Sequence, residues 1–159
     1  VTQSTSKARA TSFTRGRSGG GSLGPMAAGV GTEAGRTQRI LVIDDDPDIR
    51  RMAALSLERI GRFEVRLASG CEEALGALDQ GVPDVVLLDV SMPGMDGPAT
   101  LEALRKVPAA AAIPVIFFTA TANVTEVERL VALGGAGVIA KPFEIAELPR
   151  RVREILART

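Results

Sequence analysis

The sequence predicts an α/β fold, a three-layer sandwich in which a sheet of five parallel strands lies between two layers of helices. From Ile40 onward, five short apolar runs alternate with longer stretches of helical period, so that a strand is followed by a helix five times. Most of the runs are unbroken rather than alternating, as is typical of strands buried on both faces of a parallel sheet. Short strand–helix units joined by right-handed crossovers produce this layered arrangement.

The apolar runs predict strands at residues 40–43, 63–67, 85–88, 115–118 and 138–140. The stretches of helical period predict helices at residues 47–60, 71–78, 98–105, 124–133 and 145–156. Pro47 and Pro98 fall in first helical turns, where proline is tolerated, whereas Pro149 falls in the second turn of the last helix and should weaken or kink it. Helical spacing indicates four core positions, namely Leu55, Ile60, Leu130 and Leu133.

The amino-terminal segment, residues 1–38, differs from the rest of the chain. It is rich in Ser, Thr, Gly and Arg and cannot bury enough apolar surface to offset the entropy of ordering. Residues 1–39 carry six cations against the single acid Glu33, a net charge of +5 in a chain that is neutral overall. We expect a disordered, solvated tail over residues 1–38 and one domain over residues 39–159. The natural chain could also start at Met26, with vector-derived residues before it.

The composition excludes several kinds of site. The chain has no His, which excludes His-based acid–base catalysis, His metal ligands and an internal phosphohistidine. Cys71 is the single cysteine, so no intrachain disulfide can form. No apolar run approaches the ~20 residues of a membrane span, and no secretory signal precedes the domain. We therefore expect a cytoplasmic protein without membrane contact.

Polar residues follow four of the five predicted strands directly. The first strand runs into three aspartates, residues 44–46, and the third, fourth and fifth end at Asp89, Thr119 and Lys141. Because the carboxyl ends of parallel strands meet at one edge of the sheet, these side chains should converge. Oxygen ligands suit hard cations, and Mg²⁺ takes one or two carboxylates plus waters and substrate phosphate. A metal, an ammonium, a hydroxyl and a carboxylate nucleophile are the parts needed for phosphoryl transfer.

The motifs at these strand ends are an acidic pair after the first, "DVSMPGMDG" after the third, "TA" after the fourth and "KPF" after the fifth. In this combination, from about Arg39 to about Leu156, the sequence resembles the receiver domain of two-component response regulators, in particular a stand-alone receiver of the chemotaxis-regulator kind. The resemblance implies a flavodoxin-like fold with the strand order 2-1-3-4-5.

The resemblance also implies roles for individual residues. Asp89 would be the phosphoacceptor and part of the metal site. Asp45 would bind Mg²⁺ directly (Mn²⁺ is an alternative), Asp44 would hold metal-bound water, and the backbone carbonyl of Ser91 would complete the protein ligands.

Three further roles concern the phosphoryl group and the turns near it. The Thr119 hydroxyl would bond a phosphoryl oxygen, and Lys141, aimed inward by a cis Lys141–Pro142 peptide, would pair with Asp89 and then with the phosphoryl group. Asp46 and Asp96 are expected to turn or cap helices instead.

The function implied is that of a phosphorylation-driven binding switch and phosphoprotein, not an enzyme beyond its own phosphorylation and dephosphorylation. A histidine kinase or histidine phosphotransfer protein would supply the phosphoryl group. A downstream protein would bind the face formed by the helix after the fourth strand, the fifth strand and the last helix, with no direct contact to nucleic acid. The family usually carries an aromatic residue three positions before the lysine, where this chain has Val138, so we expect the loop at residues 120–123 and the helix after it to relay the signal.

Three alternatives remain open. The chain could be the receiver fragment of a larger hybrid kinase or regulator, or a receiver-like binding module that is never phosphorylated. The D-x-D in "IDDDPD" also fits a haloacid-dehalogenase-like phosphatase with Asp44 as its nucleophile. That enzyme class is disfavoured because no acidic pair follows the fourth strand and no cap insertion is present.

Overall fold

A sheet of five parallel strands, in the order β2-β1-β3-β4-β5, forms the centre of the fold in the computed structural model, which describes residues 35–159. Its strands are β1 (Arg39–Ile43), β2 (Glu64–Ala68), β3 (Val85–Asp89), β4 (Val115–Thr119) and β5 (Gly137–Ala140). The order and direction of the strands confirm the predicted fold class. Residues 1–34 of the expected tail lie outside the described residues, and the domain boundary stays a prediction.

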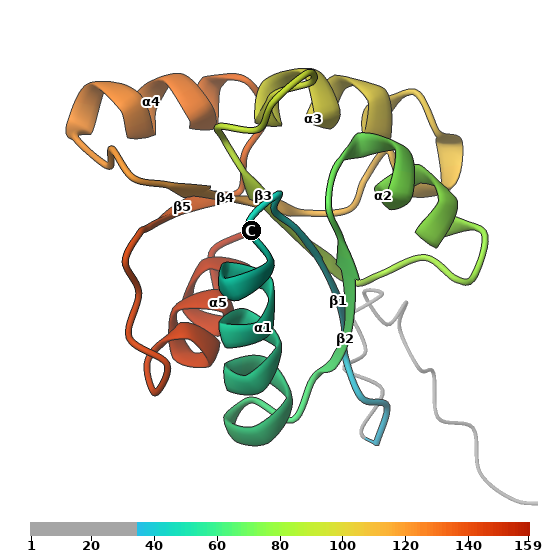
Figure 1. The fold of residues 1–159 in the computed structure, drawn as a ribbon, viewed down its shortest axis with the longest axis vertical. Helices are drawn as coiled ribbons and strands as arrows, with labels where there is room; N and C mark the ends of the chain where they lie inside the picture. Colours follow the sequence, from blue (N-terminus) through green and yellow to red (C-terminus); the bar gives the residue numbers. More distant parts are fainter. Residues whose placement is uncertain (1–34) are drawn as a thin grey trace, which may run out of the picture. The chain divides into compact units, whose positions relative to one another are not determined.

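Helices cover both faces of the sheet, with α1 and α5 on one side and α2, α3 and α4 on the other (Figure 1). The helices are α1 (Pro47–Leu55), α2 (Cys71–Leu78), α3 (Gly97–Arg105), α4 (Val124–Ala132) and α5 (Leu148–Ala157). A π-helical segment, η1 (Ser56–Ile60), continues α1, and a short 3₁₀ turn, η2 (Pro108–Ala110), follows α3. The alternation of strands and helices agrees with the pattern read from the sequence.

Successive residues of each central strand point into two separate hydrophobic cores. In β1, Leu41 and Ile43 pack with residues of α2, α3 and α4, whereas Ile40 and Val42 pack with residues of α1 and α5. All five residues of β3 and of β4 are buried, because helices cover both sides. Burial of each large apolar side chain stabilises the fold by about 1.5–3 kcal/mol, so the central strands are held rigidly.

Three polar residues cap the helices that start at the carboxyl edge of the sheet. The Asp46 carboxylate accepts a hydrogen bond from the backbone N–H of Asp48 (2.8 Å) at the start of α1. Asp96 caps α3 and Asn123 caps α4 in the same way, each bonding the N–H three residues later at 2.9 Å. These contacts confirm the expectation that Asp46 and Asp96 act as caps.

The prediction for Pro149 was wrong. Helix α5 begins at Leu148 rather than at residue 145, which places Pro149 in the first turn, where a missing N–H does no harm. Residues 144–147 instead form turns, and the carbonyl of Ile145 accepts a hydrogen bond from the Ser56 hydroxyl.

Three of the four core positions predicted from helical spacing were also wrong. Leu55, Ile60 and Leu133 are each about half exposed (52%, 50% and 49%), and only Leu130 is fully buried. A helix lying on a sheet buries a narrow stripe, and the π-helical segment after α1 changes the phase of that stripe.

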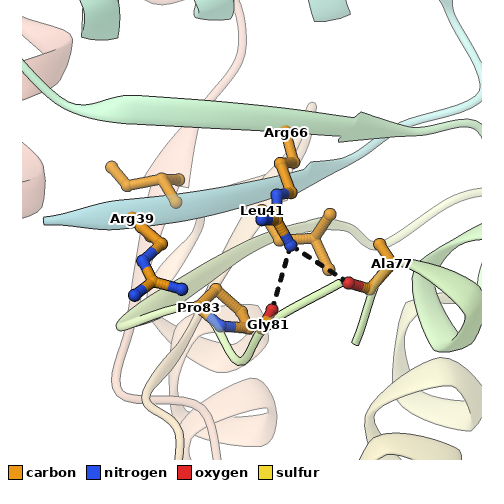
Figure 2. A pocket seen from close by; sticks show the side chains of 7 residues that line it. Arg39, Leu41, Arg66, Ala77, Gly81 and Pro83 are labelled. Atoms are coloured by element: carbon orange, nitrogen blue, oxygen red, sulfur yellow. Dashed lines mark hydrogen bonds between the residues drawn. The ribbon is translucent and has the colours of Figure 1, made fainter. Parts of the chain in front are cut away.

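Arg66, in the middle of β2, ties this edge strand to the end of α2. Its guanidinium donates to the carbonyls of Ala77 (3.2 Å) and Gly81 (3.1 Å), at and just after the end of α2 (Figure 2). It also donates to the carbonyl of Gln80 at 2.9 Å. A cation at this position also complements the negative end of the helix dipole. The small pocket there is lined by Arg39, Arg66, Ala77 and Gly81 among others, and it lies away from the polar strand ends.

Gly97 allows α3 to start directly beside the end of β3. A Cβ at this position would lie 2.5 Å from the carbonyl oxygen of Asp89 and 2.8 Å from Cα of Val90. Gly97 also donates its N–H to the carbonyl of Val90 at 2.9 Å. The close approach therefore holds the backbone that carries Asp89.

We expect Gly97→Ala to lower the free energy of unfolding by about 1–3 kcal/mol, because a clash with backbone atoms cannot relax by rotamer change. Gly76→Ala is the matched control, because nothing lies within 4 Å of its added Cβ in α2 and alanine favours helix by up to about 1 kcal/mol. Urea denaturation measures both. Equal effects of the two substitutions would show that the approach at Gly97 is not tight.

Candidate functional site

The register of the strands brings polar residues from four strand ends to one edge of the sheet. Ile43 of β1 pairs with Leu88 of β3, so that Asp44 and Asp89 follow side by side. Thr119, the last residue of β4, pairs with Ala140 of β5, the residue before Lys141. The backbone N–H of Lys141 donates to the carbonyl of Thr119 at 2.8 Å.

The Lys141 ammonium bridges two of the aspartates. Its Nζ lies 2.6 Å from Oδ2 of Asp44 and 3.0 Å from Oδ1 of Asp89. The Asp44 side chain is fully buried and Lys141 is only 16% exposed, so the ion pairs are largely removed from water. Burial of an unpaired carboxylate would be strongly unfavourable, and the charged hydrogen bonds offset that penalty.

The approach of Lys141 to the site is supported by packing. Its ammonium lies 6.0 Å from the centre of the Phe118 ring, and Phe118 stacks on Phe143 with ring centres 5.4 Å apart. The Lys141–Pro142 peptide is cis, as predicted.

Carboxylate oxygens of Asp44, Asp45 and Asp89 all lie within 4.8 Å of one another. Asp44 and Asp89 are buried, whereas Asp45 is exposed and leaves the cluster open to solvent. Three carboxylates against one ammonium leave two negative charges unmatched when all are ionised. Oxygen donors and this excess charge fit a divalent hard cation such as Mg²⁺.

Every polar atom of Asp44 has a hydrogen-bond partner. Its N–H donates to the carbonyl of Ala68 (3.1 Å), and its Oδ1 accepts from the N–H of Asp46 (2.9 Å), while Lys141 occupies Oδ2. The carbonyl oxygen of Asp44 accepts from Nη1 of Arg50 at 2.7 Å. Sequence reasoning missed this last contact, although an arginine in the first turn after an acidic strand end was a visible signal.

Two further predicted residues lie beside the cluster. The N–H of Ser91 donates to Oδ1 of Asp89 at 3.3 Å, and the role of the Ser91 carbonyl stays a prediction. The buried Thr119 hydroxyl accepts from the N–H of Thr121 (3.0 Å) and donates to the carbonyl of the same residue (3.1 Å). Thr119 is therefore next to Lys141 but is hydrogen bonded to its own loop.

The charges in the cluster change the proton affinities of its members. Burial raises the pKa of the Asp89 carboxyl above its usual range; the hydrogen bond from Lys141 lowers this pKa, and repulsion from Asp44 raises it further. Burial lowers the pKa of Lys141, but the hydrogen bonds to Asp44 and Asp89 outweigh it, and the net pKa is raised. Lys141 therefore stays an ammonium, and Asp89 is more basic than a free aspartate.

Comparison with known proteins agrees with these observations. The family described as "Response regulator receiver domain" matches residues 40–153. The "Probable transcriptional regulator ycf27" of Guillardia theta is 37% identical over 122 residues, which are 77% of this chain and 46% of that protein. The "DNA-binding response regulator MtrA" of Mycolicibacterium smegmatis is 36% identical over 121 residues, which are 76% of this chain and 51% of that protein. The chain thus spans about half the length of these curated relatives.

The fold also matches solved structures. The chemotaxis protein CheY4 of Vibrio cholerae superposes with a TM-score of 0.70 at 28% identity, covering 76% of this chain and 99% of that one. Among residues 35–159, no helix has the length and apolar character needed to cross a membrane. Receiver domains are signalling domains that interact with kinases and generally bind Mg²⁺ at an acidic pocket. By its sequence, its strand order and the residues at the carboxyl edge of its sheet, this chain belongs to the receiver domain family of two-component response regulators.

Proposed function

We propose that this chain accepts a phosphoryl group on Asp89 from a histidine kinase or a histidine phosphotransfer protein, and that phosphorylation changes its affinity for a downstream protein. The observation that carries the proposal is the Lys141 ammonium, 3.0 Å from Oδ1 of Asp89 at the open edge of the acidic cluster. A carboxylate beside a fixed cation has both the nucleophile and the charge that phosphoryl transfer requires.

The transfer exchanges one bond to phosphorus for another. A carboxylate oxygen of Asp89 attacks the phosphorus of the donor's phosphohistidine, an O–P bond forms, and the N–P bond breaks. The electron pair of the broken bond stays on the imidazole nitrogen of the donor. Lys141 then pairs with the phosphoryl oxygens, and Thr119 donates its hydroxyl to one of them after releasing the carbonyl of Thr121.

The carboxylates also suit a divalent cation. Asp45, Asp89 and the Ser91 carbonyl would hold Mg²⁺, or Mn²⁺, and Asp44 would orient a water on it. When bound, the cation neutralises charge on the phosphoryl oxygens. The exposed position of Asp45 and the 4.8 Å spread of the carboxylate oxygens support this assignment.

The signal would leave the site through α4. Thr119 and Thr121 are hydrogen bonded, and the loop that contains Thr121 ends at Asn123, the cap of α4. Val138 occupies the β5 position where the family usually has an aromatic ring, and a β-branched side chain has few rotamers. A groove lined by Val127 of α4, Val138 of β5 and Ile155 of α5 supports this face as the partner surface.

A second candidate function is favoured by the length of the relatives. The chain matches about half of proteins whose names include a DNA-binding response regulator. In that case the partner switched by Asp89 would be a DNA-binding segment of the same polypeptide, and the phosphoryl chemistry would be unchanged.

The phosphatase alternative is disfavoured by the surroundings of Asp44. Both of its carboxylate oxygens are hydrogen bonded, one to the N–H of Asp46 and one to Lys141, and its side chain is fully buried. Full burial and hydrogen bonds at both oxygens make Asp44 a poor nucleophile.

The first prediction concerns the acceptor. With Mg²⁺ present, we expect Asp89→Asn to abolish acid-labile labelling by a small phosphodonor such as acetyl phosphate, because an amide is a far poorer nucleophile. Intact-protein mass spectrometry measures the added phosphoryl group, and Asp96→Asn, in the same motif but acting as a helix cap, should label normally. Labelling of Asp89→Asn at full stoichiometry would transfer the role to another acid.

The second prediction concerns metal binding. Mg²⁺ at ten times its Kd should stabilise the folded protein by about 1.4 kcal/mol and raise the Tm by a few degrees. Asp45→Ala should remove this rise, and it should raise the Tm without metal by relieving repulsion in the cluster. Differential scanning calorimetry measures both effects, with Asp96→Ala as the control that keeps the Mg²⁺ response. A response that survives Asp45→Ala would exclude Asp45 as a ligand.

The third prediction concerns the relay. Beryllofluoride, a mimic of the phosphoryl group, should shift the backbone NMR signals of residues 119–123, of α4 and of the groove beside β5. Thr119→Ala should confine the changes to the acidic cluster, and Asp89→Asn should show none. If the wild-type changes are themselves confined to the cluster, the output leaves by another surface.

A further inference from the structure

Arg50 of α1 is hydrogen bonded to the backbone at the acidic carboxyl end of β1. Its Nη1 donates to the carbonyl oxygen of Asp44 at 2.7 Å in a partly buried setting. The neighbouring Arg51 points elsewhere: its side chain is 78% exposed and pairs only weakly with Asp48, at 3.5 Å. Of these two adjacent arginines, Arg50 therefore contacts the site, whereas Arg51 faces solvent.

The hydrogen bond from Arg50 constrains the peptide group between Asp44 and Asp45. The Asp44 carbonyl and the Asp45 N–H belong to one planar peptide group. A hydrogen bond to the carbonyl therefore also sets the orientation of the Asp45 N–H and the direction in which the Asp45 backbone leaves the strand. Strand β1 ends at Ile43, beyond which the sheet no longer holds the chain on both sides. Within residues 35–159, it is Arg50 that donates a hydrogen bond to this carbonyl.

A second set of contacts ties the same region to α2. The carboxylate of Glu73 accepts from the N–H of Ser69 at 2.8 Å, and the carbonyl of Ala68, one residue earlier, accepts from the N–H of Asp44. The Ser69 hydrogen bond lowers the pKa of Glu73, and the positive charge of Arg50 adds to that shift. These contacts connect the end of β1 to α2 through residues 68 and 69.

We propose that Arg50 is a positioning residue that aligns the Asp44–Asp45 peptide, so that the exposed carboxylate of Asp45 is ready to bind a divalent cation. This role rests on the proposed function. Arg50 contacts neither the phosphoryl group nor the reacting oxygen of Asp89. Loss of its donors leaves the carboxylates present but the Asp45 backbone free to reorient, which weakens cation binding more than it slows the chemistry.

The experiment compares Arg50→Met with Arg51→Met. Methionine keeps an apolar stem and removes the donors, and the two substitutions delete the same charge one residue apart. Mg²⁺ binding is followed by backbone NMR titration, and phosphorylation by acetyl phosphate is followed over a range of Mg²⁺ concentrations. Arg50→Lys, which restores a donor at the same position, is the rescue variant.

We expect Arg50→Met to raise the Kd for Mg²⁺ about 10-fold and the Mg²⁺ concentration for half-maximal phosphorylation by the same factor. The rate at saturating Mg²⁺ should fall less than about 3-fold. Arg51→Met should match the wild type, and Arg50→Lys should recover most of the affinity. A normal Kd in Arg50→Met, or an equal loss in Arg51→Met, would overturn the proposal, the latter by attributing the effect to charge alone.

Failure of this inference is distinguishable from failure of the proposed function. If the wild type and Arg51→Met are phosphorylated on Asp89 while Arg50→Met titrates normally with Mg²⁺, only the role of Arg50 is lost. If the wild type takes up no phosphoryl group on Asp89, the proposed function itself fails. Melting curves of each variant show whether it is folded, and Arg50→Gln, which shortens the side chain and removes its charge, replaces Arg50→Met in the Mg²⁺ titration if Arg50→Met is not folded.

Discussion

The ammonium of Lys141, shared between Asp44 and Asp89, holds together the edge of the sheet on which the rest of the site depends. It joins the ends of β1, β3 and β5, three strands that are far apart in the sequence. Without it, a fully buried carboxylate would face a second one with no countercharge, which is among the most unfavourable arrangements in a protein interior. The same ammonium is placed where negative charge from a phosphoryl group would arrive, so stability and chemistry share one interaction.

Around this bridge the site has a rigid part and a movable part. Asp44 is hydrogen bonded at every polar atom, and the strands beneath it are buried on both faces. Thr119 is different, because its hydroxyl is hydrogen bonded to the backbone of Thr121, in the loop that leads to α4. A rigid floor keeps the acids in place, while a loop that can exchange one hydrogen bond for another is suited to carry a signal.

Val138 occupies the position in β5 where the resemblance to response regulators led us to expect an aromatic ring. Val138 cannot rotate between two distinct environments as a ring can, and the groove beside it is lined by aliphatic side chains together with the charged residues Arg151, Glu154 and Arg158. The stacked pair of Phe118 and Phe143 lies instead beneath Lys141, within the core formed with α1 and α5. The Phe118–Phe143 pair therefore supports Lys141 rather than the groove beside Val138.

Much of this structure could be predicted from the sequence, because local pattern determines it. Apolar runs, most of them unbroken, predicted the five strands, and the rule that parallel strands end at one edge predicted where residues 44–46, Asp89, Thr119 and Lys141 would meet. The caps at Asp46 and Asp96 were also predictable, because a capping side chain bonds a backbone N–H only two or three residues away.

Only the tertiary structure decided the contacts between distant residues. The pairing of Lys141 with Asp89 was expected from the family resemblance, but its second and closer partner, Asp44, depends on strand register. The bond from Arg50 to the Asp44 carbonyl and the exposure of Leu55 depend on how α1 rotates on the sheet, and the late start of α5 depends on the turns before it. Periodicity determines which residues share a helix face, but only packing against the other layers determines which part of that face is buried.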